Sequence, residues 1–103
     1  MIHVIARITA KPGQRDAILE AFARNRPNVL AEDGCLEYCA VIDAEDGGKI
    51  QSPIGSDTFL VVEKWASIEA LQAHGASAHM AAYAAETKEY LAERVIHVLS
   101  PVA

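Results

Sequence analysis

The chain has 103 residues, of which 51% are hydrophobic and 22% charged, a composition typical of one globular domain spanning 1–103. Nine Lys and Arg residues face fourteen Asp and Glu residues, which gives a formal net charge of -5. This balance argues against nucleic-acid binding and against anchoring on anionic membranes, because both depend on basic side chains. No apolar run approaches the roughly 20 residues of a membrane span, and no secretory signal is visible, so we expect a cytoplasmic protein.

The first predicted elements are a strand and a helix. Residues 2–9 are rich in β-branched side chains and predict a strand, which Lys11-Pro12-Gly13 ends. Apolar residues then recur at helical spacing over 14–31. Pro27 lies inside this segment and should kink the helix or restart it near Asn28.

The rest of the chain predicts three strands and two helices. In chain order they are a strand at 35–43, a loop at 44–57, a strand at 58–66, a helix at 68–74, a helix from 77 to about 91 and a strand at 94–99. The order β-α-β-β-α-α-β is typical of an α+β, ferredoxin-like split βαβ fold with an antiparallel sheet. The Gly and Ser residues of the loop fit a lid and a passive connector equally well.

The central strands carry apolar residues at successive positions, as in 39–42 and 59–62. A half-solvated strand would alternate apolar and polar residues, so both faces of the sheet are apolar. Helices of the chain can cover only one face, and a second copy of the same sheet is the simplest cover for the other. We therefore expect a homodimer.

The two cysteines, Cys35 and Cys39, lie on one predicted strand, with Cα atoms about 13 Å apart and beyond disulfide reach. No further Cys or His follows nearby at a spacing suited to a metal. We therefore expect packing residues and no metal site, and we interpret His3 and His97 as structural residues of strands.

Polar and aromatic side chains concentrate between residues 63 and 83. Glu63 and Trp65 are two apart on a strand and point to one face. A buried carboxylate needs a partner or a raised pKa, and Lys64 points to the other face, so the partner of Glu63 must come from elsewhere.

Two histidines flank the junction between the last two predicted helices. His74 closes the first helix, where a cation also suits the helix dipole, and His79 opens the second. His79 and Tyr83 share a helical face, with Met80 beside them. Histidine takes up or releases a proton near neutral pH, so these residues and Trp65 suit a pocket for a flat, ionisable aromatic molecule. Packing alone is the plainer interpretation of Trp65 and Tyr83.

Four segments resemble the signature of the antibiotic biosynthesis monooxygenase family. They are Glu63 to His74 (EKWASIEALQAH), Ser77-Ala78-His79-Met80, Lys11-Pro12-Gly13-Gln14 and Glu32-Asp33-Gly34-Cys35. The resemblance covers essentially the whole chain and is closest to the small quinol monooxygenases.

This resemblance implies a dimeric α+β barrel that oxidises a quinol or polyphenol with O2 and needs no metal, flavin or other cofactor. A pocket base would remove the phenolic proton, and the resulting anion would pass an electron to O2. The site that it implies has His79 or His74 as the base, Trp65 as a wall, Tyr83 or Glu63 to orient the substrate, and Met80 as a further substrate contact.

Three alternative functions can be compared with the sequence. Heme degradation is rejected, because Ala6, His74 and Ala84 occupy the positions where that branch carries Asn, Trp and His. Isomerisation of a small phosphorylated sugar would need cations in the pocket, for which Arg7 and Lys64 are the few candidates. A non-catalytic module that binds a phenol or a metabolite also fits the sequence.

Overall fold

The computed structural model describes all residues from 1 to 103. Its elements are β1 (Ile2–Ala10), α1 (Arg15–Leu30), β2 (Cys35–Val41), β3 (Thr58–Trp65), α2 (Ile68–Gly75), α3 (Ala78–Thr87) and β4 (Leu91–Leu99), with short 3-10 turns η1 (Gly48–Ile50) and η2 (Lys88–Tyr90). The strands form one antiparallel sheet in the order β2-β3-β1-β4. This order confirms the predicted α+β, ferredoxin-like fold.

Three details of the helices and of β4 differ from expectation. The helix expected to reach about Leu91 ends at Thr87, and β4 begins at Leu91 instead of Arg94. The chain turns early because Ala10 pairs with Leu91, and the backbone N–H of Lys11 donates to the carbonyl of Tyr90 at 2.8 Å. In addition, α1 continues through the proline at position 27 without the expected restart.

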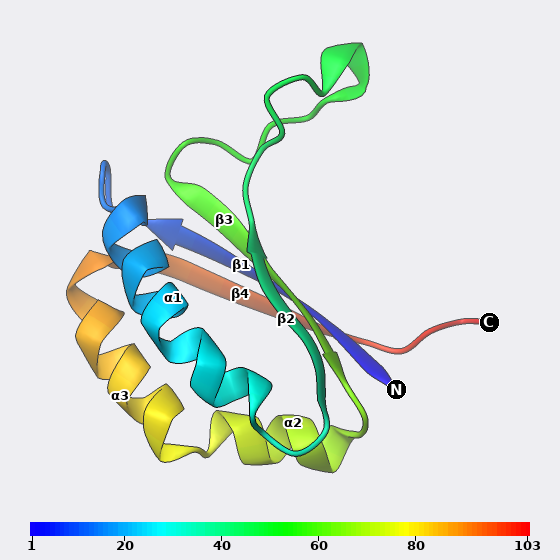
Figure 1. Cartoon of the computed structure of the whole chain (residues 1–103). Helices are drawn as coiled ribbons and strands as arrows, with labels where there is room; N and C mark the ends of the chain where they lie inside the picture. The colour runs from blue at the N-terminus through cyan, green and yellow to red at the C-terminus, as the bar shows by residue number, and fades with distance from the viewer.

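The core lies between the sheet and the helices, all of which cover one face of the sheet (Figure 1). Alternate residues of the two central strands are buried on this inner face; they are Val4, Ala6, Ile8 and Ala10 of β1 and Phe59, Val61, Glu63 and Trp65 of β3. From α1, Ile18, Phe22 and Val29 pack against them. The period-two pattern of the strands thus separates an inner face from an outer one.

The outer face of the sheet has no helix over it (Figure 1). It carries half-buried apolar side chains at its centre, among them Ile5, Val62 and Val95. Val41 and Leu99 lie on the same face and are 38% and 45% exposed. None of the helices combines the length and the apolar character that crossing a bilayer requires.

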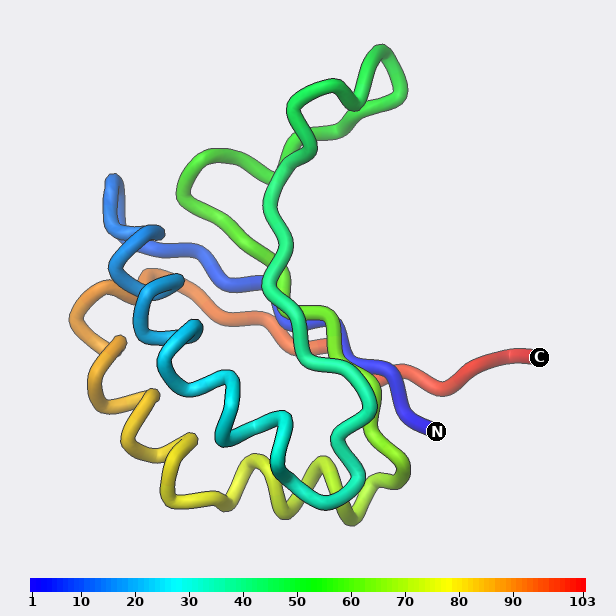
Figure 2. Tube along the Cα trace, in the orientation of Figure 1, coloured from blue at the N-terminus to red at the C-terminus, as the bar shows by residue number.

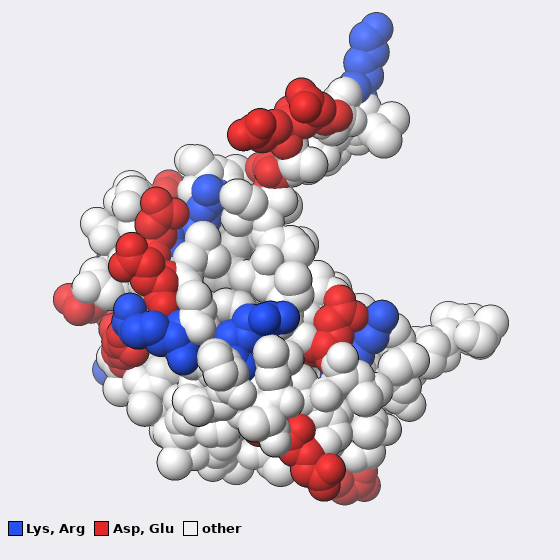
Figure 3. Space-filling model, in the orientation of Figure 1, with Lys and Arg blue, Asp and Glu red and all other residues white.

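The segment 42–57 between β2 and β3 projects away from the helices (Figure 2). Its base is held by the Asp43 carboxylate, which accepts hydrogen bonds from the backbone N–H groups of Ile54 and Gly55 and from Nε2 of Gln51. These backbone hydrogen bonds hold the pKa of Asp43 below its usual range. In the space-filling view the segment stands clear of the body and leaves a recess beside the sheet (Figure 3).

Candidate active site

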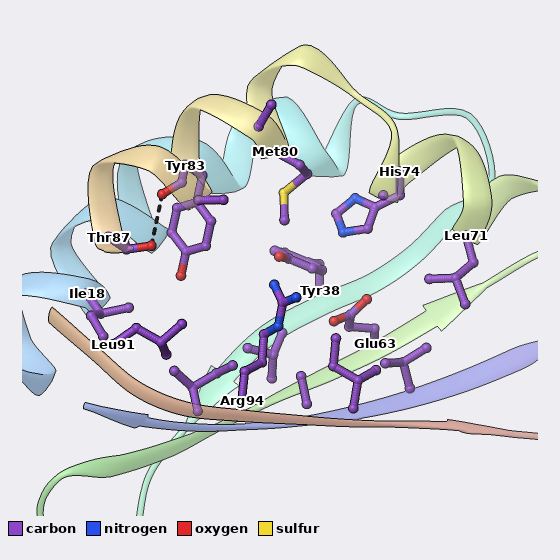
Figure 4. A pocket seen from close by; sticks show the side chains of 18 of the residues that line it. Ile18, Tyr38, Glu63, Leu71, His74, Met80, Tyr83, Thr87, Leu91 and Arg94 are labelled. Atoms are coloured by element: carbon purple, nitrogen blue, oxygen red, sulfur yellow. Dashed lines mark hydrogen bonds between the residues drawn. The ribbon is translucent and has the colours of Figure 1, made fainter. Parts of the chain in front are cut away.

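A cavity of about 900 Å³ lies between the inner face of the sheet and helices α2 and α3 (Figure 4). Of its 21 lining residues 15 are hydrophobic when the two tyrosines are included, so it suits a molecule with a large apolar body. The polar and charged side chains that line it are Tyr38, Glu63, His74, Tyr83, Thr87, Lys88 and Arg94. No residue of 42–57 lines the cavity, so the lid interpretation of that loop gains no support.

Two serine caps fix the junction between α2 and α3. The Ser67 hydroxyl accepts from the backbone N–H of Ala70 and begins α2. The Ser77 hydroxyl donates to the carbonyl of His74 at 2.7 Å and accepts from the N–H of Met80, so it ends one helix and begins the next. As a result His74 lies at the end of α2 and His79 in the first turn of α3.

Gly34 allows α2 to lie close to the turn before β2. Its φ of +83° is in the left-handed region, and an added Cβ would lie 2.6 Å from Cβ of Ala70. The carbonyl of Gly34 also accepts from the N–H of Ala66 at 2.8 Å. Glycine at this position therefore brings the turn that carries Glu32 against the helix that carries His74.

Glu32 joins the two histidines. Its Oε2 lies 2.8 Å from Nδ1 of His74 and 3.1 Å from Nε2 of His79. The side chains of Glu32 and His74 are 13% and 7% exposed, and that of His79 is 27% exposed. The carboxylate accepts a hydrogen bond from each ring, and a neutral His74 that donates from Nδ1 has its free lone pair on Nε2.

The two histidines differ in what their rings can reach. His74 lines the cavity, where its ring lies near Met80 and above Glu63 (Figure 4). His79 does not line the cavity, and its Nε2 is already occupied by Glu32. Of the two imidazoles, therefore, only that of His74 is open to a molecule in the cavity.

The same three side chains also form a possible metal-binding group. Their ligand atoms all lie within 4.8 Å of one another, and two imidazoles with a carboxylate suit a divalent transition metal. Cysteine spacing gave no hint of this group, because 42 residues separate Glu32 from His74 in the chain.

Glu63 has its partner two residues along the same strand. Nε1 of Trp65 donates to Oε1 of Glu63 at 2.9 Å. Burial raises the pKa of Glu63, while this hydrogen bond and the nearby His74 oppose the rise. The missing partner of the carboxylate is therefore Trp65.

Trp65 is not the pocket wall that we expected. It is fully buried and lies outside the cavity lining, because the imidazole of His74 packs over it with ring centroids 4.6 Å apart. The indole thus touches both Glu63 and His74 and holds them in place.

The remaining predicted contacts, Met80 and Tyr83, do line the cavity. Sδ of Met80 accepts a hydrogen bond from Nδ2 of Asn25. Burial raises the pKa of Tyr83 to about 12, the charge of Glu86 adds to this, and Arg94 opposes it. The Tyr83 hydroxyl therefore stays protonated at neutral pH and acts as a hydrogen-bond donor instead of a base.

We did not anticipate three residues of the site: Glu32, Tyr38 and Arg94. Tyr38 is buried, stacks on Phe22 at 5.1 Å and meets the ring of His74 edge to face. Burial, followed by the charge of Glu63, raises its pKa. The apolar run of β2 hid Tyr38 among core residues, and the pairing of Arg94 with Ile8, which places it on the inner face, cannot be inferred from neighbouring residues in the sequence.

Comparisons with known proteins identify the family of the chain. The family model described as antibiotic biosynthesis monooxygenase matches residues 1–86. The chain is 40% identical over 103 residues, 98% of each chain, to the Escherichia coli (strain K12) protein named probable quinol monooxygenase YgiN.

Solved structures show the same fold. PA3566 from Pseudomonas aeruginosa is 27% identical with a TM-score of 0.81, over 99% of this chain and 94% of that one. Rv0793 from Mycobacterium tuberculosis is also 27% identical, with a TM-score of 0.80, over 99% and 95%. The chain therefore belongs to the antibiotic biosynthesis monooxygenase family and is an oxidoreductase of the monooxygenase type.

Proposed function

We propose that the protein is a quinol monooxygenase that oxidises a quinol or related polyphenol with O2 and needs no bound metal, flavin or other cofactor. The named activity of the Escherichia coli relative and the apolar cavity support this function. The observation that carries it is the 2.8 Å hydrogen bond between Glu32 and His74 at the cavity wall. It orients an imidazole base toward the space where an aromatic ring would bind.

The chemistry begins with removal of a proton. A phenol with a pKa near 10 is a poor electron donor until it is deprotonated. Nε2 of His74 takes the proton, and the electron-rich anion passes an electron to O2 in a cavity lined mostly by apolar residues. Overall, a quinol and O2 give a hydroxyquinone and water. One oxygen atom enters a ring C–H bond, the other leaves in water with the two hydroxyl hydrogens, and the substrate supplies all four electrons.

The neighbouring residues have positioning roles in this proposal. Tyr83 and Glu63 orient the hydroxyl groups of the substrate, and Met80 contacts its ring. Trp65 acts through Glu63 and His74, which it touches. His79 acts through Glu32, which it holds by a hydrogen bond.

The proposal includes a cytoplasmic homodimer. A second copy placed on the outer face would cover the apolar centre that contains Ile5, Val62 and Val95. The same patch on both copies is self-complementary, as a two-fold interface requires. Sedimentation at micromolar concentration should therefore give twice the 11.1 kDa chain mass.

Oxygen uptake tests the function directly. Wild-type protein is given hydroquinones, naphthoquinols and catechols in air with a metal chelator present. We expect turnover of at least one class with chelator, and a hydroxyquinone product. Anaerobic binding without aerobic turnover would indicate the non-catalytic module. The cations named for the phosphorylated-sugar alternative, Arg7 and Lys64, lie on the outer face and give it no support.

A further inference from the structure

Arg94 has no role in the chemistry described above, yet its side chain is one of the lining residues of the cavity. It pairs with Ile8 across β1 and β4, which places it on the inner face of the sheet. Figure 4 shows the side chain rising from β4 into the space below the helices, between Tyr83 on one side and Glu63 on the other. An arginine thus reaches into a cavity whose lining is mostly apolar.

The guanidinium group has no partner in the protein. The four ion pairs of the chain involve other residues, and no side-chain hydrogen bond includes Arg94. Glu63 is the only acidic residue of the lining, and its carboxylate accepts from Trp65. The charge of Arg94 acts on Tyr83 and is not among the charges that act on Glu63. The cation is therefore available to a bound molecule.

The two sides of the cavity differ in chemistry. His74 and Glu63 lie on one side and the protonated hydroxyl of Tyr83 on the other, with the cation of Arg94 between them. Arg94 is exposed, and a guanidinium binds a carboxylate through two parallel charge-assisted hydrogen bonds. The chain carries a net charge of -5, so an anionic molecule needs such a local cation to bind.

We propose that Arg94 selects aromatic substrates that carry a carboxylate, and that it holds this group while the hydroxyl to be deprotonated faces His74. This inference deepens the proposed function, since it concerns the same cavity. It makes Arg94 a specificity-determining residue and a phenolic or quinol carboxylic acid the preferred substrate class.

Calorimetric binding tests the inference without any turnover. The probes are 2-naphthoate and its neutral counterpart 2-naphthamide, neither of which is a quinol. Wild-type protein should bind 2-naphthoate at least about tenfold more tightly than 2-naphthamide, and added salt should weaken only the naphthoate complex. Arg94→Gln should remove this preference and leave 2-naphthamide binding unchanged, while Arg94→Lys should keep part of it.

A matched control is Arg24→Gln, because Arg24 is an exposed arginine on α1 that pairs with Glu86 outside this cavity. Equal affinity of the wild-type protein for the two probes would overturn the inference. An equal loss in Arg94→Gln and Lys88→Gln would also overturn it, because it would indicate a diffuse positive field instead of a specific contact. Preferential binding of ribose 5-phosphate would contradict the aromatic class. A failure of oxygen uptake alone would count against the proposed function and not against the role of Arg94.

Discussion

The two faces of the sheet are built from the same strands, but they meet different surroundings. On the inner face Glu63 and Trp65 lie beside His74 under the helices, and Tyr38, Glu63 and Tyr83, whose pKa values are raised chiefly by burial, gather there. On the outer face Val62, the residue before Glu63, lies in an apolar patch with no helix over it. Because successive strand residues point to opposite faces, the sheet separates the face that lines the cavity from the uncovered apolar face, and most of the substitutions below act on one of the two.

The largest effect should come from the proposed base on the inner face. His74→Gln should lower kcat for quinol oxidation by about 10² to 10⁴-fold, because general-base catalysis contributes that much. Oxygen uptake measures it, and circular dichroism checks the fold. Gln72→Ala changes an exposed residue on the same helix and should leave kcat unchanged. An equal loss of kcat in His79→Gln would contradict the assignment of His74 as the base.

A charged side chain introduced on the outer face should weaken the proposed homodimer. Val62→Asp would place two carboxylates near each other in the proposed two-fold interface, raising the dimer Kd by on the order of 10²-fold or more. Sedimentation measures the change. The control is Ala73→Asp, which changes an exposed residue of α2 away from the outer face. A wild-type monomer at micromolar concentration would remove the outer face as a homodimer interface.

Substitution of Glu32 should lower kcat less than substitution of the proposed base that it orients. Glu32→Gln keeps the side-chain shape but weakens the hold on Nδ1 of His74, so kcat should fall by about 10 to 10²-fold. Glu20→Gln, an exposed acid on α1, is the matched control. Loss of activity on chelation, restored by a divalent metal, would instead assign Glu32, His74 and His79 as metal ligands.

Gly34 links the turn that carries Glu32 to α2. Gly34→Ala should lower the free energy of unfolding by more than about 1 kcal/mol, since the new Cβ meets Ala70 and the φ is positive. Denaturant unfolding measures this loss. Gly75→Ala is the control, because a Cβ there meets nothing within 4 Å. Equal stability of both variants would mean that the close approach is not required.

Glu63 should produce the smallest effect, and its sign depends on pH. Its raised pKa means that the Glu63 carboxyl binds a proton more tightly in the folded protein than in the unfolded chain. The resulting contribution to the free energy of unfolding is therefore complete below the usual carboxyl value of 4.5. It is lost as pH rises through the folded pKa. Glu63→Gln should therefore gain stability relative to wild type as pH rises above the usual carboxyl value of 4.5, by a few degrees in Tm. Glu45→Gln, in the projecting loop, should show no such trend.

Local pattern was sufficient for most of the fold. Strand periodicity, the Pro-Gly turn after β1 and the serine caps at Ser67 and Ser77 each determine a boundary through neighbouring residues. The predicted end of α3 was wrong, because the helix end depends on pairing between Ala10 and Leu91, which are distant in the chain.

The site was predictable only where neighbours in sequence are neighbours in space. Glu63 and Trp65 alternate on one strand, and His74 and His79 flank one helix junction. Glu32 reaches His74 through a turn 42 residues earlier, and Arg94 reaches the cavity through its register with Ile8. Such long-range contacts leave no periodic signal, and the same packing that created them moved Trp65 from the pocket wall to a place behind it.

The most direct test of the base is the absorbance of a bound naphthoquinol without oxygen. Mixed anaerobically below the pKa of its hydroxyl groups, the quinol should develop the absorbance of its anion in wild-type protein. With His74→Gln it should bind and remain protonated. An anion band of equal size in both proteins, or no band in the wild-type complex, would contradict the account in which Glu32 orients His74 to deprotonate the substrate.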